Sequence, residues 1–313
     1  MKSKLIKIVG LAILFFVCLN GIKAQRGFKL EYGAMTGISN YLGDVGGGAG
    51  AARAGISDIK MQKTRWNQTG YIKYKFHPYA FARLAVDYLR IEGNDAICDN
   101  PGRKYRNLSF KNDIYDIEAT IHWLFYSSAK PTGIYRKANT YLGAYLFTGI
   151  GGFYHNPQAL YQGSWVPLQP LRTEGQTNPY SHFGYCLPFG AGFFVSITHG
   201  RKAQRIGVEI NWRYTNTDYL DDVSSASWAN PTSLNSKTAA ALSNRNPELK
   251  NQPEGMAGNY GWIDDGKGNN INKAPRGNPS NKDSYISFNI TYGIAIKGKY
   301  TRSRGRKIRS ITF

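Results

Sequence analysis

Apolar and polar residues alternate with a period of two along most of this chain. In the segment 284–296, large apolar residues occupy every second position from Ile286 to Ile296, and small or polar residues lie between them. Such alternation indicates a strand with one apolar and one polar face. A run of about 11 residues is also long enough for a tilted strand to cross a bilayer.

Seven further segments show the same alternation, although its phase is unclear in the fifth of them along the chain. They are 28–39, 72–76, 82–88, 115–125, 141–154, 183–197 and 206–215. Long connections follow the first, third, fifth and seventh segments, and shorter turns follow the second, fourth and sixth. Bacterial outer-membrane barrels alternate long loops and short turns in this way.

The pattern therefore predicts an all-β fold, a transmembrane antiparallel up-and-down β-barrel of eight strands. Short turns and both termini would lie in the periplasm, and the long loops would be extracellular. A barrel this narrow is filled by its own side chains, which argues against an open pore. A soluble β-sandwich has the same period and is the alternative interpretation.

Composition agrees with a β-rich protein. Aromatic residues make up 14% of the chain and charged residues 19%. A disordered segment would be poorer in aromatic residues, and a coiled coil would be richer in Ala, Glu, Lys and Leu. The formal net charge is +20, which favours acidic or anionic partners.

Three parts follow one another along the chain. Residues 1–24 are predicted to be a signal peptide, because three lysines precede a short apolar stretch and a small residue at the cleavage point. Two alternatives for this segment are that it anchors the chain in a membrane or that the protein is a lipoprotein acylated at Cys18. Residues 25–297 form the barrel, with a long loop at 221–283. Residues 298–313 form a basic tail in the periplasm.

The basic tail is the candidate partner-binding segment. Its cations would bind an acidic protein surface or, alternatively, lipid phosphates. Nucleic acid is not expected as a partner, because an exported barrel meets none. The candidate residues are Lys299, Arg302, Arg304, Arg306, Lys307 and Arg309.

Charges of both signs lie on the polar faces of the predicted strands. Buried charges need partners, so we expect a lumen filled by salt bridges. These residues are Glu31, Lys73, Lys75, Arg83, Asp87, Asp116, Glu118, Glu209 and Arg213.

An enzyme in this barrel would need a histidine next to a carboxylate or a nucleophile. His122, His155 and His182 are the candidates, and no motif links any of them to a nucleophile. We therefore expect no catalytic residues, no small-molecule substrate and no cofactor.

Cysteines and clustered aspartates are the remaining candidate sites. Cys98 and Cys186 are both predicted near the extracellular side and could form a disulfide. Asp218, Asp221 and Asp222 could bind Ca²⁺ through carboxylate oxygens, or could cap a turn or pair with a basic residue. We favour the structural roles and predict no metal site.

Six stretches of the mature chain carry a family resemblance. They are LEYGAMTGISNYLGD (30–44), RLAVDYLRIEGND (83–95), NLSFKNDIYDIEATIHWLF (107–125), GIGGFYHNPQA (149–159), GVEINWRYTNTDYLDDVS (207–224) and RGNPSNKDSYISFNI (276–290). In their order and spacing they resemble the PorG family of Bacteroidetes outer-membrane proteins, which belongs to the type IX secretion system.

The resemblance implies a non-enzymatic outer-membrane component that associates with the periplasmic ring of the PorK lipoprotein and PorN. That machine exports cargo proteins across the outer membrane. Outer-membrane lipid is the other expected partner. A small passive channel is the first alternative function, and a membrane-embedded enzyme is the second.

Overall fold

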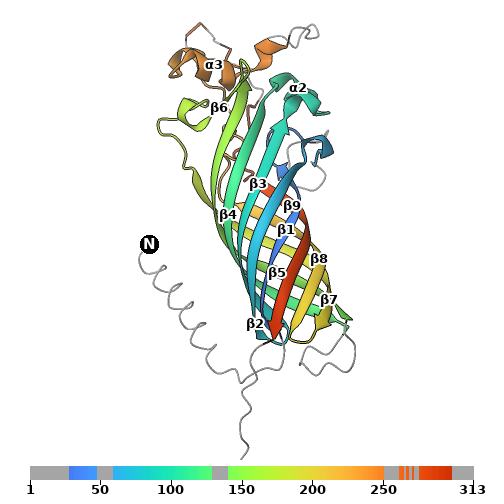
Figure 1. The fold of residues 1–313 in the computed structure, drawn as a ribbon. Coiled ribbons are helices and arrows are strands. Elements are labelled where there is room, and N and C mark those ends of the chain that lie inside the picture. The colour runs from blue at the N-terminus through green and yellow to red at the C-terminus, as the bar shows by residue number, and fades with distance from the viewer. Residues whose placement is uncertain are drawn as a thin grey trace, which may run out of the picture.

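The computed structural model describes residues 28–47, 59–128, 140–249, 261–263, 266–267, 270 and 275–297. The predicted signal peptide and the basic tail lie outside these residues. The described chain forms a tall β-barrel with its long loops gathered at one end (Figure 1).

Eight long strands close the barrel, as the sequence predicts. They are β1 (Phe28–Leu42), β2 (Arg65–His77), β3 (Ala80–Asn94), β4 (Ser109–Ser127), β5 (Thr140–Tyr161), β7 (Phe183–His199), β8 (Lys202–Thr215) and β9 (Ser284–Lys297). Each pairs antiparallel with the next in sequence, β1 pairs with β9, and the pairing of β4 with β5 completes the ring. A short strand, β6 (Ser164–Pro167), extends β5 as a hairpin beyond the wall.

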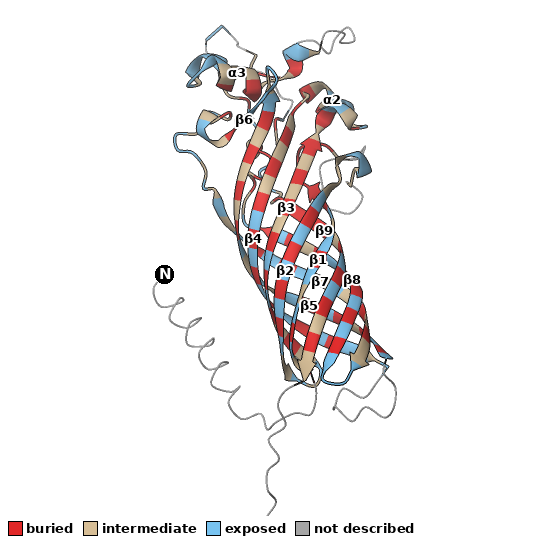
Figure 2. Cartoon of the chain, viewed as in Figure 1, coloured by how far each residue is buried: buried red, intermediate tan, exposed pale blue. Residues whose placement is uncertain are grey.

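Burial alternates along each strand, so that one set of side chains faces outward and the other fills the lumen (Figure 2). The outward set is apolar and includes Leu84, Val86, Ile117 and Ile290, each more than half exposed. Closure pairs every strand edge, which is the condition for a sheet to lie in lipid. The outward belt and the closed ring exclude the soluble β-sandwich.

Two strands differ from the simple pattern of one apolar and one polar face. On β5, Tyr145 and Phe147 point into the lumen while Leu146 and Ile150 face outward, so both faces are apolar and the sequence alone leaves the phase open. On β1, the register shifts between Phe28 and Leu30, which turns Phe28 inward. Alternation alone would place Phe28 on the outer face with Leu30, and this bulge is the reason that it lies inside.

Helices are short and occur at the long-loop end. Within the described residues, the α-helices are α2 (Pro101–Arg106) and α3 (Lys237–Ser243), and the 3₁₀ turns are η3 (Met61–Lys63), η4 (Asp95–Ile97), η5 (Gln169–Leu171), η6 (Pro231–Ser233) and η7 (Asn246–Glu248). Asn100 caps α2 and Ser236 caps α3 through their side-chain oxygens. No helix within the described residues is long and apolar enough to cross a membrane.

Candidate functional site

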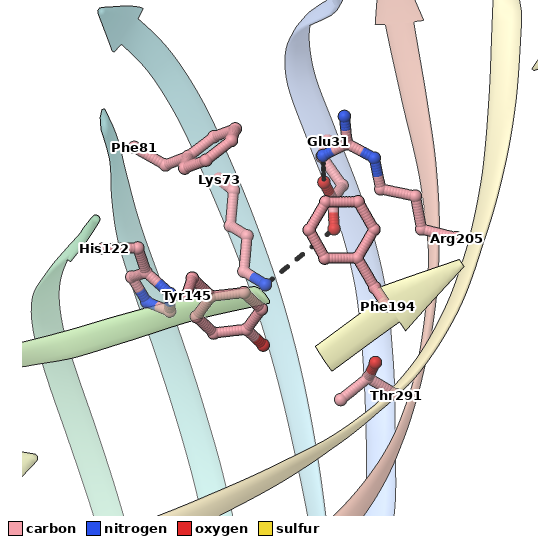
Figure 3. A pocket seen from close by; sticks show the side chains of 8 residues that line it. All are labelled: Glu31, Lys73, Phe81, His122, Tyr145, Phe194, Arg205 and Thr291. Carbon is pink, nitrogen blue, oxygen red and sulfur yellow. Dashed lines mark hydrogen bonds and ion pairs between the residues drawn. The ribbon is translucent and has the colours of Figure 1, made fainter. Parts of the chain in front are cut away.

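The lumen near the short-turn end is filled by an ion-pair cluster (Figure 3). Arg205 donates a hydrogen bond to Glu31, Tyr71 donates a second at 2.9 Å, and Lys73 lies 3.9 Å from the same carboxylate. The cavity that remains between them, lined also by Phe194, is about 10 Å³. That is about the space of one water molecule.

A second ion pair lies beside this cluster. Arg83 donates to both oxygens of Glu209 at 2.6 and 2.9 Å, and Tyr145 donates to Glu209 at 2.6 Å. These side chains come from β3, β8 and β5, so the pair joins opposite walls of the barrel. His122 stacks on Phe147, with ring centroids 4.8 Å apart, and closes this layer.

A third layer, nearer the long loops, is built around Arg213. Its guanidinium lies 3.0 Å from Asp87 and 3.1 Å from Asp116, and its Nε donates to Glu118. Tyr285 donates to Asp116 at 2.8 Å. Because three carboxylates share one guanidinium here, this layer is richer in negative charge than the two layers below it.

The predicted lumen of paired charges is therefore confirmed. Lys75 is half-buried, and its Nζ lies 5.5 Å from the centroid of the Phe81 ring. Arg205 belongs to the same network and was missed by sequence reasoning. It lies an even number of positions before Glu209, so the alternation itself could have placed it inside.

Above the lumen, the described parts of the long loops fold into a compact unit that we call the loop cap (residues 43–47, 95–108, 168–182, 216–249 and 275–283). Arg106 links three of these segments. It binds Asp95 at 2.7 Å, donates to the backbone oxygen of Asp44 at 2.7 Å, and donates to the backbone oxygen of Arg276. Asp95 in turn accepts from the backbone N–H of Gly46 at 2.8 Å.

Arg276 is the second anchor of the loop cap. It pairs with Glu174 at 2.6 Å and donates to the backbone oxygen of Asp222 at 3.1 Å. The Asp222 side chain accepts hydrogen bonds from Thr173 and, at 2.8 Å, from Tyr180. Burial raises the pKa of Asp222 to about 7, although Arg276 and both hydroxyl groups oppose this rise.

Tyr41 joins the cap to the barrel wall. Its hydroxyl lies 2.6 Å from Asp221 and 2.7 Å from Asp283, and it accepts from the backbone N–H of Asp44 at 2.9 Å. One hydroxyl proton can serve only one of the two carboxyls, so the other contact requires a protonated carboxyl. Burial and neighbouring carboxylates raise the pKa of both Asp221 and Asp283 well above the usual range.

The three aspartates that the sequence suggested for Ca²⁺ do not converge. Asp221 binds Tyr41, Asp222 binds Thr173 and Tyr180, and Asp218 accepts from Ser224 at 2.7 Å. They cap and connect loops, which is the role that the sequence analysis favoured. Burial raises the pKa of Asp218 to about 6.

The disulfide considered between Cys98 and Cys186 does not form in this structure. Both cysteines are buried and lie outside any disulfide. Cys98 contacts the backbone oxygen of Gly46 at 3.6 Å in the loop cap, whereas Cys186 faces Asp116 at 3.9 Å in the lumen. The loop after β3 packs into the cap and does not carry Cys98 down to β7.

None of the three histidines is hydrogen-bonded to a carboxylate or a thiol among the described residues. His122 contacts the Thr120 hydroxyl at 2.9 Å within the lumen. His155 contacts the backbone oxygen of Ser181 at 3.1 Å, and His182 contacts the backbone oxygen of His155 at 2.9 Å. None of them has a carboxylate partner in these contacts. The six candidate residues of the basic tail lie outside the described part of the chain.

A closed ring of eight antiparallel strands, apolar outside and filled by ion pairs inside, defines a transmembrane β-barrel of the outer-membrane type. Within this class, residues 7–236 match the family described as a domain of unknown function, DUF6089. The chain belongs to this family. No curated protein matches the sequence.

Two solved barrels are similar to this chain at low identity. Neisserial surface protein A is 11% identical, with 88% of this chain and 100% of that chain covered and a TM-score of 0.30. Ail, the attachment invasion locus protein of Yersinia pestis, was solved in complex with the heparin analogue sucrose octasulfate. It is 10% identical, with 86% and 99% covered and a TM-score of 0.29.

Proposed function

We propose that this protein is a structural outer-membrane component of the type IX secretion system that associates with the periplasmic PorK and PorN ring. Six sequence stretches that resemble the PorG family support this role. The observation that favours a structural role over transport is the filled lumen, whose cavity between Glu31, Lys73 and Arg205 holds about one water molecule. Exported cargo would pass outside this barrel.

The topology supports contact from the periplasmic side. β1 starts and β9 ends at the short-turn end of the barrel, opposite the loop cap (Figure 1). With the short turns in the periplasm, the tail that follows Lys297 would emerge there as well. Its cations would bind an acidic surface of the ring.

An affinity pull-down from solubilised outer membranes tests this proposal. The full-length protein would carry a tag in a long loop, and mass spectrometry would identify what it retains. Recovery of the ring proteins is expected. Recovery of the barrel alone, under conditions that keep the ring itself intact, would overturn the proposal.

The tail is tested separately. Replacing all six cations from Lys299 to Arg309 with glutamine should reduce ring recovery at least tenfold while the barrel stays folded. A matched control replaces two exposed cations of the loop cap, Lys104 and Lys237, with glutamine and should leave recovery unchanged. Equal recovery from both variants would exclude the tail as the contact.

A further inference from the structure

A second cluster of chemical groups in the lumen has no part in the proposed function. Asp116 and Glu118 on β4 and Cys186 on β7 are all buried, and each offers a potential metal-ligand atom. These three atoms lie within 4.8 Å of one another. They gather at Gly151 on β5, where an added Cβ would lie 2.7 Å from the Cys186 Sγ and 3.1 Å from the Asp116 Oδ1.

One oxygen of this cluster has an unused lone pair. The Asp116 Oδ1 is buried and has no hydrogen-bond partner. Its other oxygen, Oδ2, is occupied by Tyr285 at 2.8 Å and by Arg213 at 3.1 Å. Asp87 lies opposite Asp116 in the register of β3 and β4. The Oδ2 of Asp87 is also buried without a hydrogen-bond partner.

The charge of this layer calls for a further cation. The carboxylates of Asp87, Asp116 and Glu118 share the single guanidinium of Arg213. Arg83 approaches Glu118 only at 3.7 Å and is bound mainly to Glu209. Buried charges are stable when they are paired or when they coordinate a metal.

A lone pair that receives no hydrogen bond can bind a proton or a metal ion. The Asp116 Oδ1 accepts no hydrogen bond from the described residues, and a proton there would need an acceptor of its own. A metal ion instead accepts the lone pair directly. A mixed set of thiolate and carboxylate ligands suits Zn²⁺, whereas Ca²⁺ and Mg²⁺ prefer oxygen alone.

We infer that Asp116, Glu118 and Cys186 form a binding site for one divalent transition metal ion of the zinc type, with Asp87 beside it. Binding forms the metal–sulfur bond and releases the thiol proton to solvent. Arg213 would keep its contacts with Asp116 and Glu118 and hold these carboxylates in place. The ion would tie β4 to β7 across β5, and this departs from the prediction of no metal made from the sequence.

Cobalt is a suitable probe because a Co²⁺–thiolate bond absorbs in the near ultraviolet. The untagged mature chain would be refolded in detergent with and without Co²⁺, since the buried site must be loaded as the barrel closes. We expect one Co²⁺ per barrel, with thiolate charge-transfer absorption. Adding Zn²⁺ should displace the Co²⁺ and remove this absorption. Folding would be checked independently by the faster gel mobility of the unheated barrel.

Two cysteine variants provide the decisive comparison. Cys186→Ala should abolish the absorption and lower the metal content at least tenfold, whereas Cys98→Ala should leave both unchanged. Cys98 is an appropriate control because it is also buried and outside any disulfide, and it lies in the loop cap. Folded wild-type barrel without stoichiometric metal, or equal absorption from Cys186→Ala, would overturn the inference.

Discussion

Replacing Arg213 with methionine would test the ion-pair lumen most directly. The side chain is only 1% exposed and contacts three carboxylates, of Asp87, Asp116 and Glu118. Methionine fills similar space but leaves these carboxylates without their cation. Removing one partner of a buried ion pair costs about 3–5 kcal/mol, so we expect the free energy of unfolding to fall by about that much.

The matched control is Arg90→Met. Arg90 pairs with Asp113 at 2.6 Å, but both side chains are about 30% exposed, at 31% and 30%. Solvent screens such a pair, and its loss is expected to cost at most about 1 kcal/mol. The double variant Arg213→Met with Glu118→Gln should recover at least about 1 kcal/mol, because it removes one of the unpaired charges.

Urea titration of the refolded barrel in lipid vesicles would measure these differences, with tryptophan fluorescence and gel mobility as two independent probes. The order expected is wild type, Arg90→Met, the double variant and Arg213→Met, from most to least stable. A cost below about 1 kcal/mol for Arg213→Met would refute the view that the lumen depends on this cation.

Three further predictions concern the loop cap, the wall and the lumen. Because burial raises the pKa of Asp222 to about 7, the folded cap holds a proton that the unfolded chain releases, so cap stability should fall as pH rises towards and through 7. Hydrogen-exchange protection factors of 216–249, which correct for the base-catalysed intrinsic exchange rate, should be higher at pH 5 than at pH 8, and Asp222→Asn should reduce this difference. Gly149→Ala should block folding, because the added Cβ would lie 2.1 Å from the backbone oxygen of Ala119. In the control Gly70→Ala, the added Cβ meets nothing within 4 Å, so this variant should fold normally. Gel mobility of the unheated barrel would measure both outcomes. Planar-bilayer recordings should detect no stable conductance, and steady single-channel steps would contradict a filled lumen.

The strand pattern could be predicted from the sequence because the outward face of each strand is apolar and the inward face carries polar and charged residues. On β4, Ile117 and Ile121 face outward while Asp116 and Glu118 face inward, and this contrast is visible in the residues alone. The phase of β5 could not be predicted, because its inward aromatic rings and its outward aliphatic residues are equally apolar.

Contacts between distant loops could not be predicted either. Arg276 pairs with Glu174 over a separation of 102 residues, and Arg106 reaches Asp44 over 62. No local spacing encodes these partners, since each depends on how two loops fold over the barrel mouth. The metal-ligand cluster was missed for a similar reason, because Cys186 meets Asp116 only after β5 aligns β4 with β7.

The ion pairs that cross the lumen also constrain how this barrel can be assembled. Arg83 on β3 meets Glu209 on β8, and Arg213 on β8 meets Glu118 on β4. Early strands therefore carry charges whose partners lie on β8, near the end of the chain. Until the β1–β9 seam forms, these charges must stay hydrated, so an open, lipid-filled intermediate is costly. Closure should consequently be cooperative, because the ion pairs that cross the lumen form only when β8 joins the early strands.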